Sequence, residues 1–278
     1  GSEMCIRDRN IWDNLNIKEV VSYDFNQNNE RVWWDPRSND GRSSNGVYQR
    51  VMGNRAKLNT QTQLTYNKVI AEKHTLDALI GFETEDYKYD YVYANGNTYP
   101  SYLPEIENAG NTRASSSVQR YRMTSFLGRL NYDYKQRYLL EGNLRYDGSS
   151  KFRPENRWQF FWGVSGGWRL SEESFMHSLS SVVNNLKLRL SYGVLGNQSG
   201  VDRYDGTQLY NFASSNGAYI GSGKVSTIDT NGKIVTTDRT WERIHSYNLG
   251  VDFGFLNNRL TGTFELFMKN CLLYTSPS

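Results

Sequence analysis

Cysteine, histidine and proline are scarce in this chain of 278 residues, which has two, three and five of them. The cysteines, Cys5 and Cys271, lie near opposite ends, so the stretch between them has neither a disulfide framework nor a thiolate metal site. The histidines, at positions 74, 177 and 245, are far apart and have no partner one helical turn away. We therefore expect no metal ion and no cofactor.

Long apolar runs and an excess of one charge are also missing. No stretch approaches the ~18 apolar residues that a membrane helix needs, and the mean hydropathy is -0.70. This excludes helical spans only, because a strand that crosses a membrane places its apolar residues at every second position. The 32 basic and 29 acidic residues leave a net charge of +3, so we expect no nucleic-acid partner.

Signs of catalysis are weak as well. Gly163-Val-Ser-Gly-Gly167 matches the G-x-S-x-G pattern of a hydrolase nucleophile, but it lies inside an alternating strand, with no strand-to-helix turn directly after the serine. Two carboxylate pairs, Glu83 with Glu85 and Asp202 with Asp205, fit a solvated or lumenal face as well as a catalytic one. We expect no catalytic residue, and a protein that is not an enzyme.

Aromatic residues and strand-like alternation are abundant. The chain has 20 Tyr, 12 Phe and 7 Trp. The stretch 137–170 predicts a hairpin, because apolar residues occupy every second position of both arms while the alternate positions are small or polar. The apolar positions are Tyr138, Leu140, Gly142, Leu144 and Tyr146 in the first arm, and Trp158, Phe160, Trp162, Val164, Gly166, Trp168 and Leu170 in the second.

The same period recurs along the chain and predicts about nine strands. One short helix is expected near 172–180, where a serine precedes two glutamates and apolar residues recur at helical spacing. Short links are expected near 69–73, 135–136 and 256–258, with a medium one at 171–185. Long loops are expected at about 26–46, 94–117 and 197–240, because polar and turn-forming residues dominate there.

Alternation alone is compatible with two all-β architectures. In a soluble sandwich the apolar face packs inward, whereas in a membrane barrel it meets lipid and the polar face lines the lumen. Three observations favour the barrel. Short links alternate with long ones, several strands reach the ~9–11 residues that cross a bilayer, and aromatic residues collect at the short-link ends. We predict an all-β fold, a partial transmembrane antiparallel up-and-down β-barrel.

The two ends interrupt this pattern. Residues 1–9 and 271–278 fit neither neighbouring strand and resemble translated sequencing adapters. We therefore expect both to be non-native terminal sequence, and we assign residues 10–270 to one barrel fragment.

Several motifs together resemble one protein family. They are Asn131-Tyr-Asp-Tyr-Lys-Gln-Arg-Tyr-Leu-Leu140, Leu144-Arg-Tyr-Asp-Gly-Ser-Ser150, Asn156-Arg-Trp158, Gly167-Trp-Arg-Leu-Ser-Glu-Glu173, Leu188-Arg-Leu-Ser-Tyr-Gly193 and Tyr247-Asn-Leu-Gly250. In sequence and spacing they resemble the barrel of SusC/RagA-type TonB-linked outer-membrane proteins over most of residues 11–270. One step departs from the family, because Phe161-Trp162-Gly163 stands where a Phe-Pro-Ser-like sequence is usual.

The resemblance implies a multi-pass barrel in the outer membrane of a Gram-negative cell, with its plug and TonB box outside this chain. It implies energy from the TonB–ExbB–ExbD system, a SusD-like surface lipoprotein as partner, and outer-membrane lipid around the wall. The implied function is import of oligosaccharides or peptides. A soluble carbohydrate-binding all-β protein is the alternative.

Two sets of residues are candidates for contacts. Aromatic rings in the expected loops are suited to stacking on sugars or packing a partner, although packing against each other is the simpler interpretation for any one of them. These rings are Trp33, Trp34, Tyr99, Tyr102, Tyr204, Tyr210 and Tyr219. The residues expected to face the lumen include Glu141, Asn143, Arg145, Lys187 and Arg189.

Overall fold

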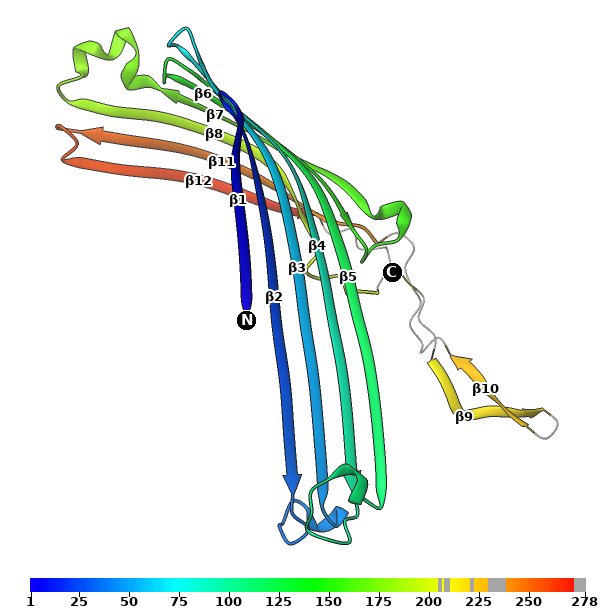
Figure 1. Cartoon of the computed structure of the whole chain (residues 1–278). Helices are drawn as coiled ribbons and strands as arrows, with labels where there is room; N and C mark the ends of the chain where they lie inside the picture. The colour runs from blue at the N-terminus through cyan, green and yellow to red at the C-terminus, as the bar shows by residue number, and fades with distance from the viewer. Residues whose placement is uncertain (205–206, 208–210, 221–222, 230–238, 273–278) are drawn as a thin grey trace. The chain divides into compact units, whose positions relative to one another are not determined.

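The computed structural model describes residues 1–204, 207, 211–220, 223–229 and 239–272, and for 211–220, 223–229 and 272 it describes the backbone. Within these residues ten strands form one sheet in the order of the sequence, and two more form a separate small sheet (Figure 1). The ten are β1 (Ser2–Trp12), β2 (Leu15–Trp34), β3 (Val47–Ile70), β4 (His74–Asn97), β5 (Asn111–Tyr134), β6 (Tyr138–Ser149), β7 (Trp158–Arg169), β8 (Val183–Asn197), β11 (Glu242–Phe255) and β12 (Leu260–Leu272). The small sheet pairs β9 (Asn211–Ile220) with β10 (Gly223–Asp229) inside the link from β8 to β11.

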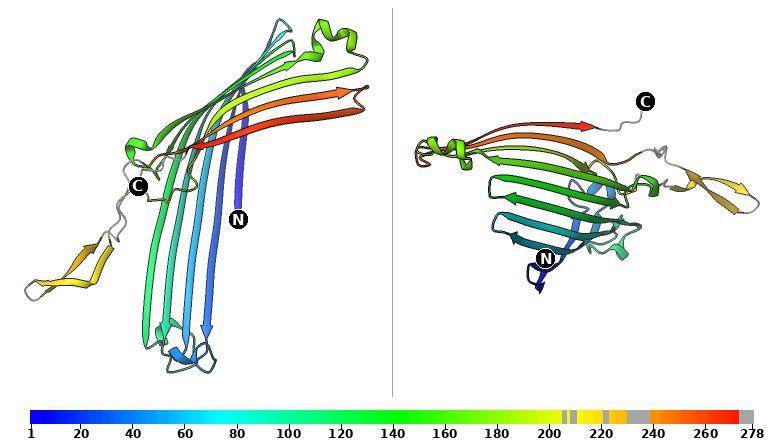
Figure 2. Two further views of the ribbon diagram at one scale, coloured as in Figure 1. Left: turned by 180° about the vertical axis from the view of Figure 1, so that it is seen from behind. Right: turned by 90° about the horizontal axis from the view of Figure 1, so that it is seen from above.

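Two compact units divide the chain. The first comprises Gly1–Ile6, Val20–Thr60 and Thr84–Arg122. The second comprises Arg7–Glu19, Gln61–Glu83 and Met123–Ser278. In the second unit β6, β7, β8, β11 and β12 run side by side in both views of Figure 2, and each strand pairs antiparallel with the next. The all-β, up-and-down prediction is confirmed, with ten strands in the main sheet where about nine were expected.

Tight turns join the strands at the predicted short links. The β3–β4 link has Ala71 and Glu72 at φ of 51° and 54°, and the β5–β6 link has Lys135 and Gln136 at 54° and 56°. Two successive left-handed residues match the right-handed twist of an antiparallel pair, which is why such turns close hairpins. Neighbouring links are also hydrogen-bonded, as where the Lys135 amide donates to the Lys73 carbonyl at 2.6 Å. Together they form one edge of the second unit.

Several strands are longer than the sequence pattern predicted. The polar run at 26–30 belongs to β2, and β4 and β5 leave a loop of only 98–110 where 94–117 was expected. The sequence pattern missed these strand ends because apolar and polar residues alternate only where the two faces of a strand differ in polarity. A strand whose two faces are both polar keeps its backbone pairing but loses the period of two.

The expected short helix near 172–180 is present, and it is of the 3-10 type. The structure has two 3-10 segments there, η4 (Leu170–Glu172) and η5 (Ser174–Leu179). A segment this short does not recover the cost of nucleating an α-helix, so it adopts tighter turns. Further 3-10 turns are η1 (Arg42–Ser44), η2 (Ile106–Asn108) and η3 (Pro154–Asn156). No helix in the described part of the chain has the length and apolar character to cross a membrane.

The terminal residues join the outermost strands of the sheet. Residues 2–9 belong to β1, and Cys271 lies in β12. That residues 1–9 and 271–278 are non-native stays a prediction.

Candidate functional site: the polar face and its charged hollow

The second unit has one apolar face that is left uncovered. Leu140, Leu190 and Phe264 are 55%, 64% and 58% exposed, although they belong to the apolar alternation of β6, β8 and β12. A soluble sandwich would bury such side chains against a second sheet. Large apolar patches remain exposed on a protein only where something apolar covers them in use.

Two rows of aromatic rings bound this apolar face. Next to the short links, Tyr138 stacks between Tyr134 and Trp168, with ring centroids 6.3 and 6.4 Å away. Further along the same strands Tyr146 stacks on Trp158 at 5.0 Å. Tyr138 and Tyr146 are eight residues apart on β6, about 26 Å along the strand. This is comparable with the roughly 25 Å apolar band of outer-membrane barrels before strand tilt shortens it.

Two histidine–tyrosine pairs add polar groups to the aromatic rings of the second unit. His74 Nδ1 lies 2.7 Å from the Tyr132 hydroxyl in the row near the short links. On β8 and β11 the Tyr192 hydroxyl lies 2.8 Å from His245 Nδ1, and the Tyr192 ring is 5.3 Å from that of Trp162. Amphipathic rings of this kind are enriched where a membrane meets water. Of the aromatic residues expected at the short-link ends, Tyr132, Tyr134, Tyr138 and Trp168 lie in one row with His74.

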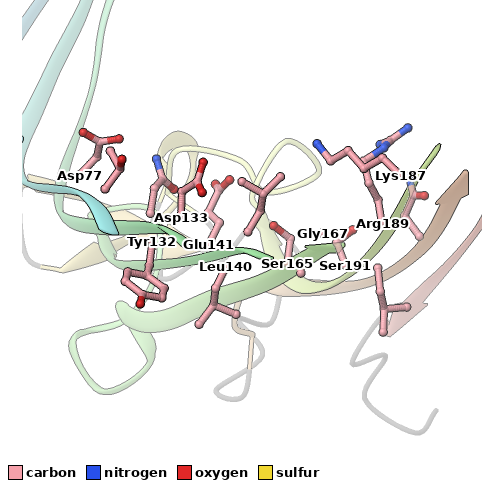
Figure 3. Close-up of a pocket in the computed structure, with 16 residues that line it drawn as sticks. Asp77, Tyr132, Asp133, Leu140, Glu141, Ser165, Gly167, Lys187, Arg189 and Ser191 are labelled. Atoms are coloured by element: carbon pink, nitrogen blue, oxygen red, sulfur yellow. The ribbon is translucent and has the colours of Figure 1, made fainter. Parts of the chain in front are cut away.

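The opposite, polar face contains a hollow of about 510 Å³. Asp77, Asp133 and Glu141, on β4, β5 and β6, line one side of it, and Lys187 and Arg189 on β8 line the other (Figure 3). Ser165, Gly167 and Ser191 lie between the two groups, while Tyr132 and Leu140 point away to the apolar face. The register explains this arrangement, because Glu141 pairs with Ser165, and Gly167 with Arg189.

The two basic residues of the hollow differ in their partners. Arg189 donates two parallel hydrogen bonds of 2.9 Å to Asp252 and a third of 2.7 Å to Glu265. Its charge is therefore matched within the wall. Lys187 makes no such close ion pair among the described residues. Its side chain passes over Gly167, and its Cε lies 3.2 Å from the position that a Cβ of residue 167 would occupy. Asn131 also lines the hollow, and its buried Oδ1 has no hydrogen-bond partner there. Lys187 and Asn131 thus both have spare bonding capacity in the hollow.

A second polar cluster surrounds Arg145. Its guanidinium contacts Asp147 at 2.8 Å, Glu83 at 3.0 Å and the Ser125 hydroxyl at 3.0 Å. Asp147 and Ser125 are both buried. Gln61 donates to the same Glu83 carboxylate. The cluster links β3, β4, β5 and β6 through side chains, so its role in the wall is structural.

A small buried core lies at the long-link end of β7 and β8. Phe152, Phe161, Val194 and Trp241 are each at most 7% exposed and pack together. The Trp241 indole donates to the Arg157 carbonyl at 3.0 Å, which holds the start of β11 against the β6–β7 link. Phe161 lies at an alternate position that the pattern predicted to be small or polar. A large apolar ring on the otherwise polar face of the strand was the sequence feature that could have indicated this core.

The predicted loop aromatics separate into packed and exposed rings. Trp33 packs against Tyr99 and Tyr48 with ring centroids 4.9 and 6.5 Å away, and Tyr99 is buried. These rings hold the links after β2 and β4 together. Tyr102 is 60% exposed under the Arg37 guanidinium, and Trp34 is exposed as well.

Four further predicted positions lie in or near the link from β8 to β11. Tyr204 is exposed in the β8–β11 link. Asp205 and Tyr210 lie outside the described residues, and Tyr219 belongs to β9, whose side chains are not described either. That any of these loop aromatics contacts a ligand stays a prediction.

The residues predicted to face the lumen share the polar face. Glu141, Lys187 and Arg189 line the hollow, Arg145 is in the second cluster, and the Asn143 amide lies over Gly163. Ser165 of the G-x-S-x-G sequence is in mid-strand beside the hollow. Glu173, which sequence reasoning did not single out, accepts hydrogen bonds from the Tyr138 hydroxyl and the Trp168 indole at 2.6 and 3.1 Å.

An antiparallel meander with an uncovered apolar face, two aromatic rows and a charged inner hollow defines the wall of a membrane β-barrel. Residues 6–270 match the family described as TonB dependent receptor-like, beta-barrel. The chain belongs to this family of outer-membrane proteins.

Two relatives and one solved structure illustrate the similarity. The chain is 33% identical over 194 residues to the TonB-dependent receptor SusC of Bacteroides thetaiotaomicron, covering 69% of this chain and 19% of SusC. It is 31% identical over 225 residues to the TonB-dependent receptor P39 of Formosa agariphila, covering 76% of this chain and 20% of P39. The solved structure of the RagAB peptide transporter superposes on this chain with a TM-score of 0.83. The match covers 97% of this chain and 30% of the transporter chain at 22% sequence identity, and it shows that the fold is shared. The chain therefore spans about a fifth of the length of these two relatives.

Proposed function

We propose that this chain forms part of the wall and external loops of a TonB-dependent importer of polar solutes. The observation that carries the proposal is the hollow on the polar face, where Asp77, Asp133 and Glu141 oppose Lys187 and Arg189. A wall with hydrogen-bonding groups of both signs suits the passage of hydrated substrates, while the apolar face with its aromatic rows suits lipid. The soluble alternative is not supported, because no second sheet covers the apolar face in the described residues.

Oligosaccharides are the first substrate class that we propose. Exposed rings such as Trp34 and Tyr102 offer flat faces on which sugar rings stack. Peptides are the second class, since a hollow with separated acidic and basic groups complements the two charged ends of a short peptide. The relatives are receptors by name, and we propose no enzymatic role for this chain.

The whole receptor needs partners that this chain does not contain. We propose that a SusD-like surface lipoprotein closes the barrel from outside and that the TonB–ExbB–ExbD system supplies energy through segments upstream. The relatives named TonB-dependent receptor support the second point. The first point rests on the resemblance of the sequence motifs to SusC/RagA-type proteins.

The test is uptake by the full-length receptor in its own cells. Lys187→Gln and Glu141→Gln change the hollow without changing side-chain size much, so each should reduce uptake of labelled oligosaccharide or peptide several-fold at unchanged receptor level. Lys88→Gln is the control, because Lys88 belongs to the first unit and pairs with Asp90 at the surface. Uptake that is unaffected by both hollow substitutions, or that persists without TonB, would contradict the proposal.

A further inference from the structure

The apolar face contains a hollow of its own, about 560 Å³ in volume. This lies in the roughly 300–1,000 Å³ range of small-molecule sites. Its apolar lining comes from Tyr138, Leu140, Trp168, Leu188, Leu190 and Leu249 on β6, β7, β8 and β11. It is separated by the sheet from the charged hollow, so it has no part in the proposed import path.

Gly166 creates this hollow, which we call the Gly166 notch. In the register of the sheet Gly166 stands between Leu140 of β6 and Leu190 of β8. A Cβ at this position would meet nothing within 4 Å. Leu140 points to the apolar face in Figure 3, and the side chains of both flanking leucines are more than half exposed. The result is a slot between two leucine walls with a backbone floor.

The end of the notch toward the short links is polar. Tyr138 and Trp168 stack there nearly parallel, at an interplanar angle of 14°. Their hydroxyl and indole N–H groups both donate to Glu173, whose side chain is only 12% exposed. Rings with an apolar body and a tethered polar tip mark the depth at which hydrocarbon gives way to headgroups.

Two cations lie at this polar end. Arg137 adjoins Tyr138, and its Nη1 is 3.6 Å from Glu173 while a third of its side chain stays exposed. The Lys135 ammonium lies 5.2 Å from the centre of the Tyr134 ring on an exposed turn. Together with Glu173 they leave a net positive charge beside the rings. A guanidinium has donors in a fork that suits phosphate oxygens as well as carboxylate oxygens.

We propose that the Gly166 notch binds one phospholipid. An acyl chain lies over Gly166 between Leu140 and Leu190, and the phosphate is held near Lys135 and Arg137. Short links of outer-membrane barrels face the periplasm, so the lipid belongs to the periplasmic leaflet. The apolar slot excludes a sugar or peptide, which would leave polar groups without partners, and the cations at its end favour an anionic lipid.

The test uses the full-length receptor, purified in detergent and incubated with palmitoyl-oleoyl phosphatidylglycerol. Bound lipid is counted by native mass spectrometry across a concentration series. Gly166→Leu fills the slot and should weaken lipid binding about ten-fold, the effect expected when a few buried methylenes lose their contacts. Gly142→Leu is the matched control, because Gly142 is also an apolar-face glycine with nothing within 4 Å of a Cβ, and it does not line the notch.

A second arm tests the headgroup and does not depend on folding of the Gly166 variant. Lys135→Gln combined with Arg137→Gln changes only residues at the short link and should weaken phosphatidylglycerol binding several-fold, with no effect on a diacylglycerol of the same chains. Equal lipid binding by the Gly166 and Gly142 variants would overturn the proposal. So would unchanged phosphatidylglycerol binding in the double variant, or binding of a second receptor copy at the notch in place of lipid.

Discussion

The ring of Phe161 lies directly against the backbone of Gly196, leaving no room for a Cβ at that position. The contact joins β7 to the end of β8, where the long link toward β11 begins. Together with Trp241 and Phe152, Phe161 forms the buried core at this end of the strands. Gly196 thus permits the apolar contact that packs the start of the β8–β11 link against the sheet.

Gly196→Ala should therefore destabilise the receptor. The added methyl must displace the Phe161 ring, and overpacking of this kind costs about 1–3 kcal/mol. Urea unfolding of the full-length receptor in detergent measures the change. Gly142→Ala is the control, because open space surrounds its Cβ position, and it should stay within about 0.5 kcal/mol of the parent. Equal stability of the two variants would show that the Phe161 contact is unimportant.

A glycine in the turn between β3 and β4 should stabilise the receptor. Glu72 has a φ of 54°, a left-handed conformation that costs a residue with a side chain about 1 kcal/mol. Glu72→Gly should raise the free energy of unfolding by a similar amount in the same urea experiment. Val69→Gly, in the regular part of β3, should lower it instead. Destabilisation by Glu72→Gly would mean that the Glu72 side chain has a role that outweighs its strain.

Glu173 should make the short-link region sensitive to acid. Hydrogen bonds from Tyr138 and then Trp168, with the nearby Arg137 charge, hold the pKa of Glu173 below its usual value of 4.5. Because the pKa is lowered in the folded state, the stabilisation that ionised Glu173 contributes is fully present above pH 4.5. It is lost as the pH falls through the lowered pKa.

A nitroxide on Phe175→Cys reports this change, because Phe175 is exposed two residues from Glu173. We expect its mobility to rise as the pH falls below about 4.5. The same label in a Glu173→Ala background should be mobile at every pH. A pH response that survives Glu173→Ala would assign the transition to another group.

Arg145 should matter for stability more than a surface cation does. Arg145→Ala leaves Asp147, a carboxylate 5% exposed, without its guanidinium partner. We expect a loss of about 2 kcal/mol, below the value for fully buried pairs because Arg145 itself is 39% exposed. Lys88→Ala removes an exposed pair with Asp90 and should cost under about 0.5 kcal/mol in the same assay. Similar losses in the two variants would mean that the Arg145 cluster is no more than surface charge.

Much of the wall could be predicted from the chain alone. The alternation of Tyr138, Leu140 and their successors specifies strands with two unlike faces, since side chains along a strand point alternately to opposite sides. The short links near residues 71 and 135 were predicted from pattern breaks and are present as tight turns. The short helix near 172–180 was predicted as well, but helical spacing over so few residues does not tell a 3-10 helix from an α-helix.

The sequence by itself thus determined the strand type, the faces and the family resemblance, because all three depend on local periodicity and on motifs within single hairpins. Only the tertiary structure decided which side chains meet. Asp77, Asp133, Glu141 and Lys187 come from four strands, and it is the strand register that assembles them around one hollow. The same holds for Gly166, an unremarkable position in one strand that becomes a notch only because leucines of both neighbouring strands stand beside it.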